Sequence, residues 1–77
     1  MYYDNRALSY AEKQNYQEAL EDYTSSIELY PTDPETYYQR ALVKILIGNK
    51  YDACLDFKKA DELGSPEAKA EMKKHCK

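Results

Sequence analysis

Large apolar residues recur every three or four positions along most of this chain, which is the spacing that places them on one face of an α-helix. The residues on this repeating face are Tyr3, Tyr10, Leu20, Tyr23, Ile27, Tyr37, Val43, Phe57 and Leu63. Polar residues fill the positions between them, and nowhere does the strict alternation of a β-strand take over. The pattern therefore predicts helices at about residues 2–14, 17–29, 34–47, 51–63 and 66–76.

Turn-forming residues interrupt the pattern at the predicted helix ends. Gln14-Asn15 and Gly48-Asn49 break it in the middle of each half, where Asn or Gly can adopt the left-handed conformation that ends a helix. Asp33-Pro34-Glu35 combines a capping side chain, a proline at the first helical position and an acid near the positive end of the helix dipole. Ser65-Pro66-Glu67 repeats that arrangement and predicts the start of the last helix.

The chain matches itself when it is shifted by 34 residues. Aligned positions include Tyr3 with Tyr37, Arg6 with Arg40, Ala7 with Ala41, Ala19 with Ala53, Asp22 with Asp56, and Tyr23 with Phe57. A fixed period of this length is the mark of stacked structural repeats. The second Pro-Glu start follows the first by 32 residues, so the last helix is out of register and is predicted to be a cap.

The spacing of aromatic and small residues resembles the tetratricopeptide repeat family. The family positions are held by Tyr3, Ala7, Tyr10, Ala19, Tyr23, Ser26 and Pro31 in the first unit and by Tyr37, Ala41, Ala53, Phe57 and Ala60 in the second. Departures are Lys44 where an aromatic is usual, Ser65 where proline is usual, and Arg6 and Arg40 where leucine is common. The stretch from Asp52 to Ala60, with the Lys-rich helix after it, resembles bacterial members.

This resemblance implies an all-α fold, a right-handed superhelix of antiparallel helix hairpins with five helices. Residues 1–77 would form one domain, with repeat one at about 2–31, repeat two at about 34–64 and a capping helix at about 66–76. The chain enters a helical pattern at once without a capping residue. We therefore expect it to be a fragment of a longer protein.

The resemblance also implies that the first helix of each pair lines a concave face, the usual ligand surface of the family. The residues expected to bind a peptide there are Asp4, Asn5, Leu8, Glu12, Glu35, Tyr38, Gln39, Leu42 and Ile45. Tyr38, Leu42, Ile45 and Leu46 also form an apolar stripe of their own. Either the last helix covers part of this stripe, or the stripe is a groove for a partner segment.

Some co-chaperones of the family grip a C-terminal carboxylate with Asn, Lys and Arg from these helices. Asn5 matches the asparagine of that clamp, but Glu35 and Gln39 stand where the lysine and arginine would be. Glu35 would repel a carboxylate, so the sequence argues against this ligand.

Cys54 and Cys76 lie eleven residues before and after Ser65, where the chain reverses between its last two helices. These are facing positions in an antiparallel hairpin, so the two cysteines form either a disulfide or a reduced pair of small core residues. The protein would be periplasmic or secreted in the first case and cytoplasmic in the second. His75 adds a third potential metal ligand, but no closely spaced pair is present, and we expect no metal or other cofactor.

Charge and composition narrow the partners further. Hydrophobic residues make up 43% and charged residues 32%, which is typical of a soluble domain, and no apolar run reaches the roughly 20 residues of a membrane helix. The net charge of −3 conceals an acidic first half, because residues 1–35 hold eight acids and two bases. Lys69, Lys73, Lys74 and Lys77 are interpreted as a solvated face, and neither nucleic acid nor membrane insertion is expected.

The sequence favours a binding module over an enzyme. It contains a single histidine, no Gly-rich phosphate loop and no nucleophile with a matching base. The leading hypothesis is a protein-interaction module that holds a peptide or protein segment on its concave face. Two alternatives remain, a structural segment of a longer solenoid and a homo-oligomer formed through the uncapped N-terminal helix.

Overall fold

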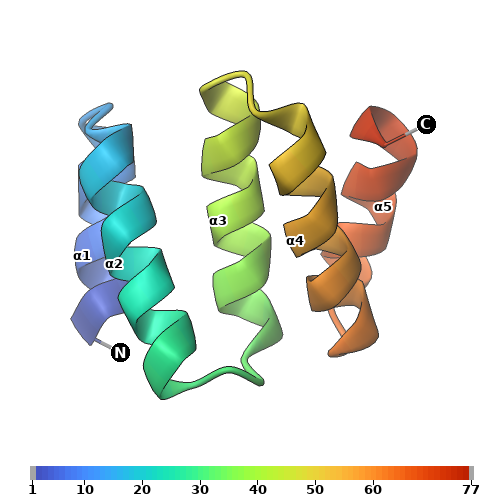
Figure 1. Cartoon of the computed structure of the whole chain (residues 1–77), viewed down its shortest axis with the longest axis horizontal. Coiled ribbons are helices and arrows are strands. Elements are labelled where there is room, and N and C mark those ends of the chain that lie inside the picture. Colours follow the sequence, from blue (N-terminus) through green and yellow to red (C-terminus); the bar gives the residue numbers. More distant parts are fainter. Residues whose placement is uncertain (1, 77) are drawn as a thin grey trace.

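The computed structural model describes residues 2–76, and side chains from Asp4 onward. Five helices follow one another in antiparallel order (Figure 1). They are α1 (Tyr2–Glu12), α2 (Tyr16–Leu29), α3 (Pro34–Leu46), α4 (Lys50–Glu62) and α5 (Pro66–His75). The predicted all-α fold with five helices is confirmed, and each observed end lies within two residues of its prediction. No helix in the described part is long and apolar enough to cross a membrane.

Each helix packs against the next, so that α1 and α2 form one hairpin, α3 and α4 a second, and α5 closes the stack against α4 (Figure 1). Ala7, Ala19, Ala41 and Ala53, one on each of the first four helices, are all fully buried. Two aromatic rings fill the space around them, Tyr23 in the first hairpin and Phe57 in the second. The side chain of Tyr3, which the sequence placed on the same apolar face, lies outside the described part.

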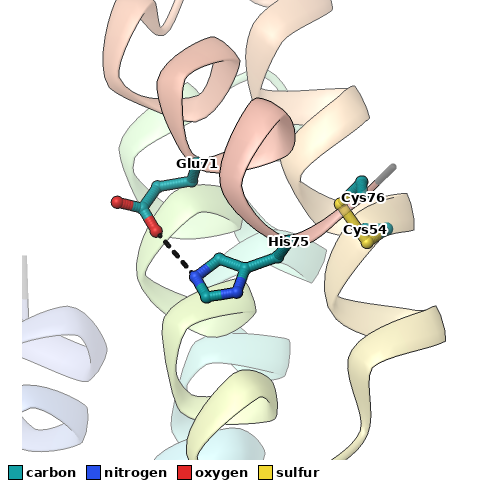
Figure 2. Close-up of a disulfide and its surroundings, with 4 residues drawn as sticks. All are labelled: Cys54, Glu71, His75 and Cys76. Atoms are coloured by element: carbon teal, nitrogen blue, oxygen red, sulfur yellow. Dashed lines mark ion pairs between the residues drawn. A yellow bond between two sulfur atoms is a disulfide. The ribbon is translucent and has the colours of Figure 1, made fainter.

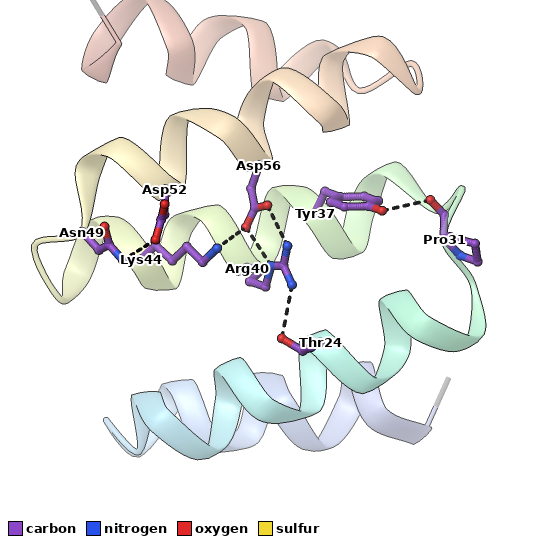
Figure 3. A network of polar contacts seen from close by, with 8 residues as sticks. All are labelled: Thr24, Pro31, Tyr37, Arg40, Lys44, Asn49, Asp52 and Asp56. Carbon is purple, nitrogen blue, oxygen red and sulfur yellow. Dashed lines mark hydrogen bonds and ion pairs between the residues drawn. The ribbon is translucent and has the colours of Figure 1, made fainter.

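The arginines that depart from the family pattern form an ion pair inside each hairpin. Arg6 holds Asp22 through two hydrogen bonds of 2.6 and 2.7 Å, and Arg40 holds Asp56 through two of 2.7 and 2.8 Å. Lys44 adds a contact of 3.0 Å to the Asp56 carboxylate (Figure 3). The departures at Arg6, Arg40 and Lys44 therefore supply partners for two aspartates that are each only 5% exposed.

The second hairpin is also tied to the first by polar contacts. Arg40 donates to the Thr24 hydroxyl of α2 over 3.2 Å, and the Tyr37 hydroxyl donates to the Pro31 carbonyl oxygen over 3.1 Å (Figure 3). The Arg40 guanidinium lies 5.8 Å from the centre of the Tyr37 ring. These contacts fix how α3 sits against α2.

The turn within each hairpin contains one residue in the left-handed conformation, and the residue type differs between the two repeats. Gly48 takes this conformation with φ +83°, as expected. In the first repeat it is Gln14, with φ 63°, whereas Asn15 has φ −87° and precedes α2. Assigning the left-handed conformation to Asn15 was therefore wrong, because the equivalence with Gly48 falls on Gln14.

The two predicted Pro-Glu helix starts are confirmed. Asp33 accepts a hydrogen bond from the Glu35 backbone N–H over 3.1 Å, and Ser65 accepts one from that of Ala68 over 3.3 Å. Pro34 and Pro66 each occupy the first helical turn, where the missing N–H costs no hydrogen bond. The same local signal thus starts both α3 and the out-of-register α5.

Helix α5 closes the core that is built from α3 and α4. Tyr38, Leu42 and Ile45 are half-buried against this core, as are Met72 of α5 and Cys76 just after it. The His75 ring stacks on Phe57 with ring centres 6.4 Å apart, and its Nε2 lies 3.3 Å from the Glu71 carboxylate (Figure 2). The apolar stripe is therefore partly covered by internal packing rather than left as an open groove.

A disulfide joins Cys54 of α4 to Cys76, with the two Cα atoms 5.8 Å apart (Figure 2). It closes a loop with a sequence separation of 22 residues, and a constraint of that length stabilises the folded chain by about 3 kcal/mol through the unfolded state. The bond thus anchors the C-terminal end of α5 to the second repeat.

We expect Cys76→Ser to lower the free energy of unfolding by about 3 kcal/mol for this reason. Urea denaturation of the oxidised wild type and of the variant measures the difference. A reductant should lower the midpoint of the wild type to that of the variant and leave the variant unchanged. Equal midpoints for the oxidised wild type and Cys76→Ser would contradict the anchoring role.

Candidate functional site

A pocket of about 260 Å³ opens between the first helices of the two repeats. We call it the α1–α3 pocket; it is lined by Asp4, Asn5 and Leu8 of α1, Tyr23 of α2, and Glu35, Thr36 and Gln39 of α3. Five of these residues, all but Tyr23 and Thr36, belong to the set that was expected to bind a peptide. The structure thus brings residues some 30 positions apart in sequence to one site.

The other four expected residues do not line this pocket. Tyr38, Leu42 and Ile45 pack against the core beneath α5, and Glu12 is exposed at the last position of α1. The ring of Tyr38 lies 6.0 Å from that of Phe57, between centres. The residues expected on one binding face are therefore divided in the structure between the α1–α3 pocket and the core that α5 covers.

A hydrogen bond across the pocket connects the two repeats. The Thr36 hydroxyl, on a residue only 1% exposed, lies 3.0 Å from Asp4 Oδ2 and 3.4 Å from Asp33 Oδ2. Asp4 Oδ1 is also buried, but it has no hydrogen-bond partner among the described residues. Asp4 is therefore held at the floor of the pocket with one carboxylate oxygen unpaired.

The second carboxylate of the pocket, that of Glu35, lies at its rim. Glu35 is exposed and accepts a hydrogen bond from the Gln39 amide over 2.9 Å, one helical turn further along α3. This contact orients the Gln39 side chain beside the pocket. The site therefore combines two acids with the amides of Asn5 and Gln39 and the apolar side chain of Leu8, which is 45% exposed.

The Tyr23 hydroxyl is affected by its burial first and by the two acids second. Burial raises the pKa of its hydroxyl to about 12, and the negative charges of Asp4 and Glu35 add to the effect. The phenol therefore stays protonated at every physiological pH.

This shift makes stability depend on pH in the alkaline range. Because the folded pKa lies above the ordinary value of 10.0, the stabilisation is complete below pH 10 and is lost as the pH rises toward 12. We expect the free energy of unfolding to fall by about 2 kcal/mol across this interval. Urea titrations at pH 9 and pH 11.5 measure how much the free energy of unfolding falls between the two pH values. The fall should be about 2 kcal/mol smaller in Tyr23→Phe than in the wild type. An equal fall in both would contradict the assignment to Tyr23.

Sequence reasoning missed Tyr23 and Thr36 as pocket residues. Tyr23 was interpreted only as a packing residue, yet its repeat equivalent, Phe57, lacks the hydroxyl, and this difference was the available signal. Thr36 follows the α3 cap by three positions and aligns with Tyr2, so the repeat offered no indication of its role.

Among the described residues, no group of three or more His, Cys, Asp or Glu side chains could hold a metal ion. The described lining of the α1–α3 pocket offers carboxylates, amides, a threonine hydroxyl and a phenol. These groups bind by hydrogen bonding and charge.

Comparison with known proteins identifies the repeat. Residues 5–33 match the family model described as tetratricopeptide repeat. The chain is 42% identical over 62 residues to the protein SGT1 homolog of Bos taurus and 41% identical over 58 residues to that of Homo sapiens. These alignments cover 80% and 75% of this chain but only 18% and 16% of the two relatives, so the chain spans less than a fifth of their length.

The matched repeat covers α1 and α2, and the second hairpin repeats its architecture. Buried alanines recur at Ala7 and Ala41, and the bidentate arginine–aspartate pair recurs after 34 residues. Proteins built from such repeats are protein-interaction modules. The chain belongs to the tetratricopeptide repeat family.

Proposed function

We propose that this chain binds a segment of a partner protein across α1 and α3, with one side chain of that segment entering the α1–α3 pocket. The observation that carries the proposal is that the first helices of both repeats build one pocket. Its volume of about 260 Å³ lies below the usual range of sites for whole small molecules and fits a single side chain.

The pocket surroundings suit an extended or helical peptide. Asn5 and Gln39 can each donate and accept hydrogen bonds, which matches the alternating groups of a peptide backbone. Leu8 offers an exposed apolar contact beside them. We assign the site to binding rather than catalysis because its described lining contains no histidine, cysteine, serine or lysine. The Thr36 hydroxyl, which meets the Asp4 carboxylate, belongs to a residue only 1% exposed.

Selection of short random peptides by phage display tests the proposal. Peptides selected on the wild-type chain are synthesised and their affinities measured for Asn5→Ala and Gln39→Ala. Each variant should lose about tenfold in affinity, because each removes hydrogen bonds at the rim of the pocket. Gln17→Ala is the matched control, since Gln17 is exposed on α2 and lies outside the pocket.

Circular dichroism of each variant shows whether a loss of affinity comes from a lost contact or from unfolding. Both alanine substitutions should leave the helix content unchanged. Wild-type affinity in Asn5→Ala and Gln39→Ala, or an equal loss in Gln17→Ala, would show that the peptides bind elsewhere.

A further inference from the structure

The α1–α3 pocket presents negative charge at two depths. The Asp4 carboxylate lies at the floor, where the Thr36 hydroxyl is within 3.0 Å of Oδ2 and Oδ1 has no partner among the described residues. The Glu35 carboxylate lies at the exposed rim, where it accepts one bond from Gln39. These contacts are with neutral groups, so neither carboxylate charge is neutralised by them.

The one base within α1 is bound to another carboxylate. Arg6 lies on the same helix as Asp4, but its guanidinium Nε and Nη2 both hold Asp22, at 2.6 and 2.7 Å. Residues 1–35 contain one other base, Lys13, which follows the end of α1 at Glu12. The described lining of the pocket includes Asp4 and Glu35 but no lysine or arginine.

A buried polar side chain also reaches the pocket without a partner. Tyr23 lines the pocket and is 1% exposed, yet it takes part in none of the side-chain hydrogen bonds found among the described residues. Its oxygen can accept from a bound donor, as can the Asp4 and Glu35 carboxylates. The described lining is thus rich in acceptors and contains no charged donor.

From this arrangement we infer that the α1–α3 pocket takes a lysine or arginine side chain of the partner segment. The inference rests on the proposed function and names the chemistry of the residue that the pocket holds. Leu8 would contact the apolar stem while the charged end lies between the two carboxylates.

The inference is tested on the peptides selected by phage display. Each lysine is replaced by norleucine and each arginine by citrulline, which remove the charge while keeping the approximate shape. At one peptide position, this replacement should weaken binding to the wild-type chain about tenfold. It should weaken binding to Glu35→Gln much less, because the peptide replacement and the Glu35 substitution each remove the same charge pair. Glu35 is suited to this test because it is exposed and its carboxylate is bonded, among the described residues, only to Gln39.

Three further measurements make the outcome decisive. Affinity should fall as salt is raised, since an exposed charge pair is screened. Acetylating the peptide α-amine should leave affinity unchanged, which separates a side-chain cation from a terminal one. Glu62→Gln, an exposed acid at the end of α4 and outside the pocket, is the matched charge control and should behave as the wild type.

Peptides that depend on Asn5 and Gln39 but tolerate loss of every basic side chain would overturn the inference and leave the proposed function standing. Loss of binding on acetylation alone would also overturn it. Peptides whose affinity is unchanged by Asn5→Ala and Gln39→Ala would refute the proposed function and the inference together.

Discussion

Replacing Phe57 with alanine is expected to remove a large part of the chain's free energy of unfolding. The ring is fully buried, and it lies between Tyr38 of α3 and His75 of α5, with ring centres at 6.0 and 6.4 Å. Such a truncation costs about 3 to 5 kcal/mol. A domain of 77 residues is stabilised by only about 4 to 12 kcal/mol in total.

Urea denaturation followed by circular dichroism measures the loss for Phe57→Ala. Leu55→Ala is the matched control, because Leu55 lies on the same helix but is 53% exposed, and it should cost less than about 1 kcal/mol. If both variants lost the same small amount, Phe57 would not be the centre of the core between α3, α4 and α5.

The second large effect is expected for Asp56→Ala. The side chains of its partners Arg40 and Lys44 are only 17% and 18% exposed, so removing the carboxylate leaves two poorly hydrated cations side by side. Breaking a buried pair in this way costs about 3 to 5 kcal/mol. The loss should appear as a lower urea midpoint.

The repeat supplies a matched comparison in Asp22→Ala. Its partner Arg6 has a side chain that is 42% exposed, so water can replace the Asp22 carboxylate beside the guanidinium, and the expected cost is about 1 to 2 kcal/mol. Equal losses in the two variants would contradict the view that exposure of the arginine sets the difference.

The helices could be predicted from the sequence because their signals are local. Asp33-Pro34-Glu35 and Ser65-Pro66-Glu67 each contain a side chain that caps the helix it precedes. The period of 34 residues then placed the two hairpins in equivalent positions. Gln14 shows the limit of such signals, because its left-handed conformation is required by the turn and not favoured by its side chain.

The site could be predicted only in part, because it depends on how helices rotate and pack. The helical face placed Asp4, Asn5, Leu8, Glu35 and Gln39 together, and these five residues line one pocket. That they bind a peptide stays a prediction. The same reasoning could not tell that Tyr38 and Leu42 turn toward the core that α5 covers.

Side-chain contacts between different helices were equally hard to predict from the sequence. The Asp4–Thr36 hydrogen bond joins residues 32 positions apart, a spacing that no repeat match revealed. Arg6 and Arg40 were interpreted as departures from the family pattern, although each repeats with its aspartate at the same separation of 16 residues. Equal separations of opposite charges in both repeats were the signal that could have identified these ion pairs.

Mapping a selected peptide by NMR on the isotope-labelled chain tests the central claim, that partner segments bind across α1 and α3. Binding at the α1–α3 pocket predicts the largest amide shifts at Asn5, Leu8, Thr36 and Gln39, with small shifts in α4 and α5. Largest shifts in α4 and α5, with the pocket amides unmoved, would contradict the account.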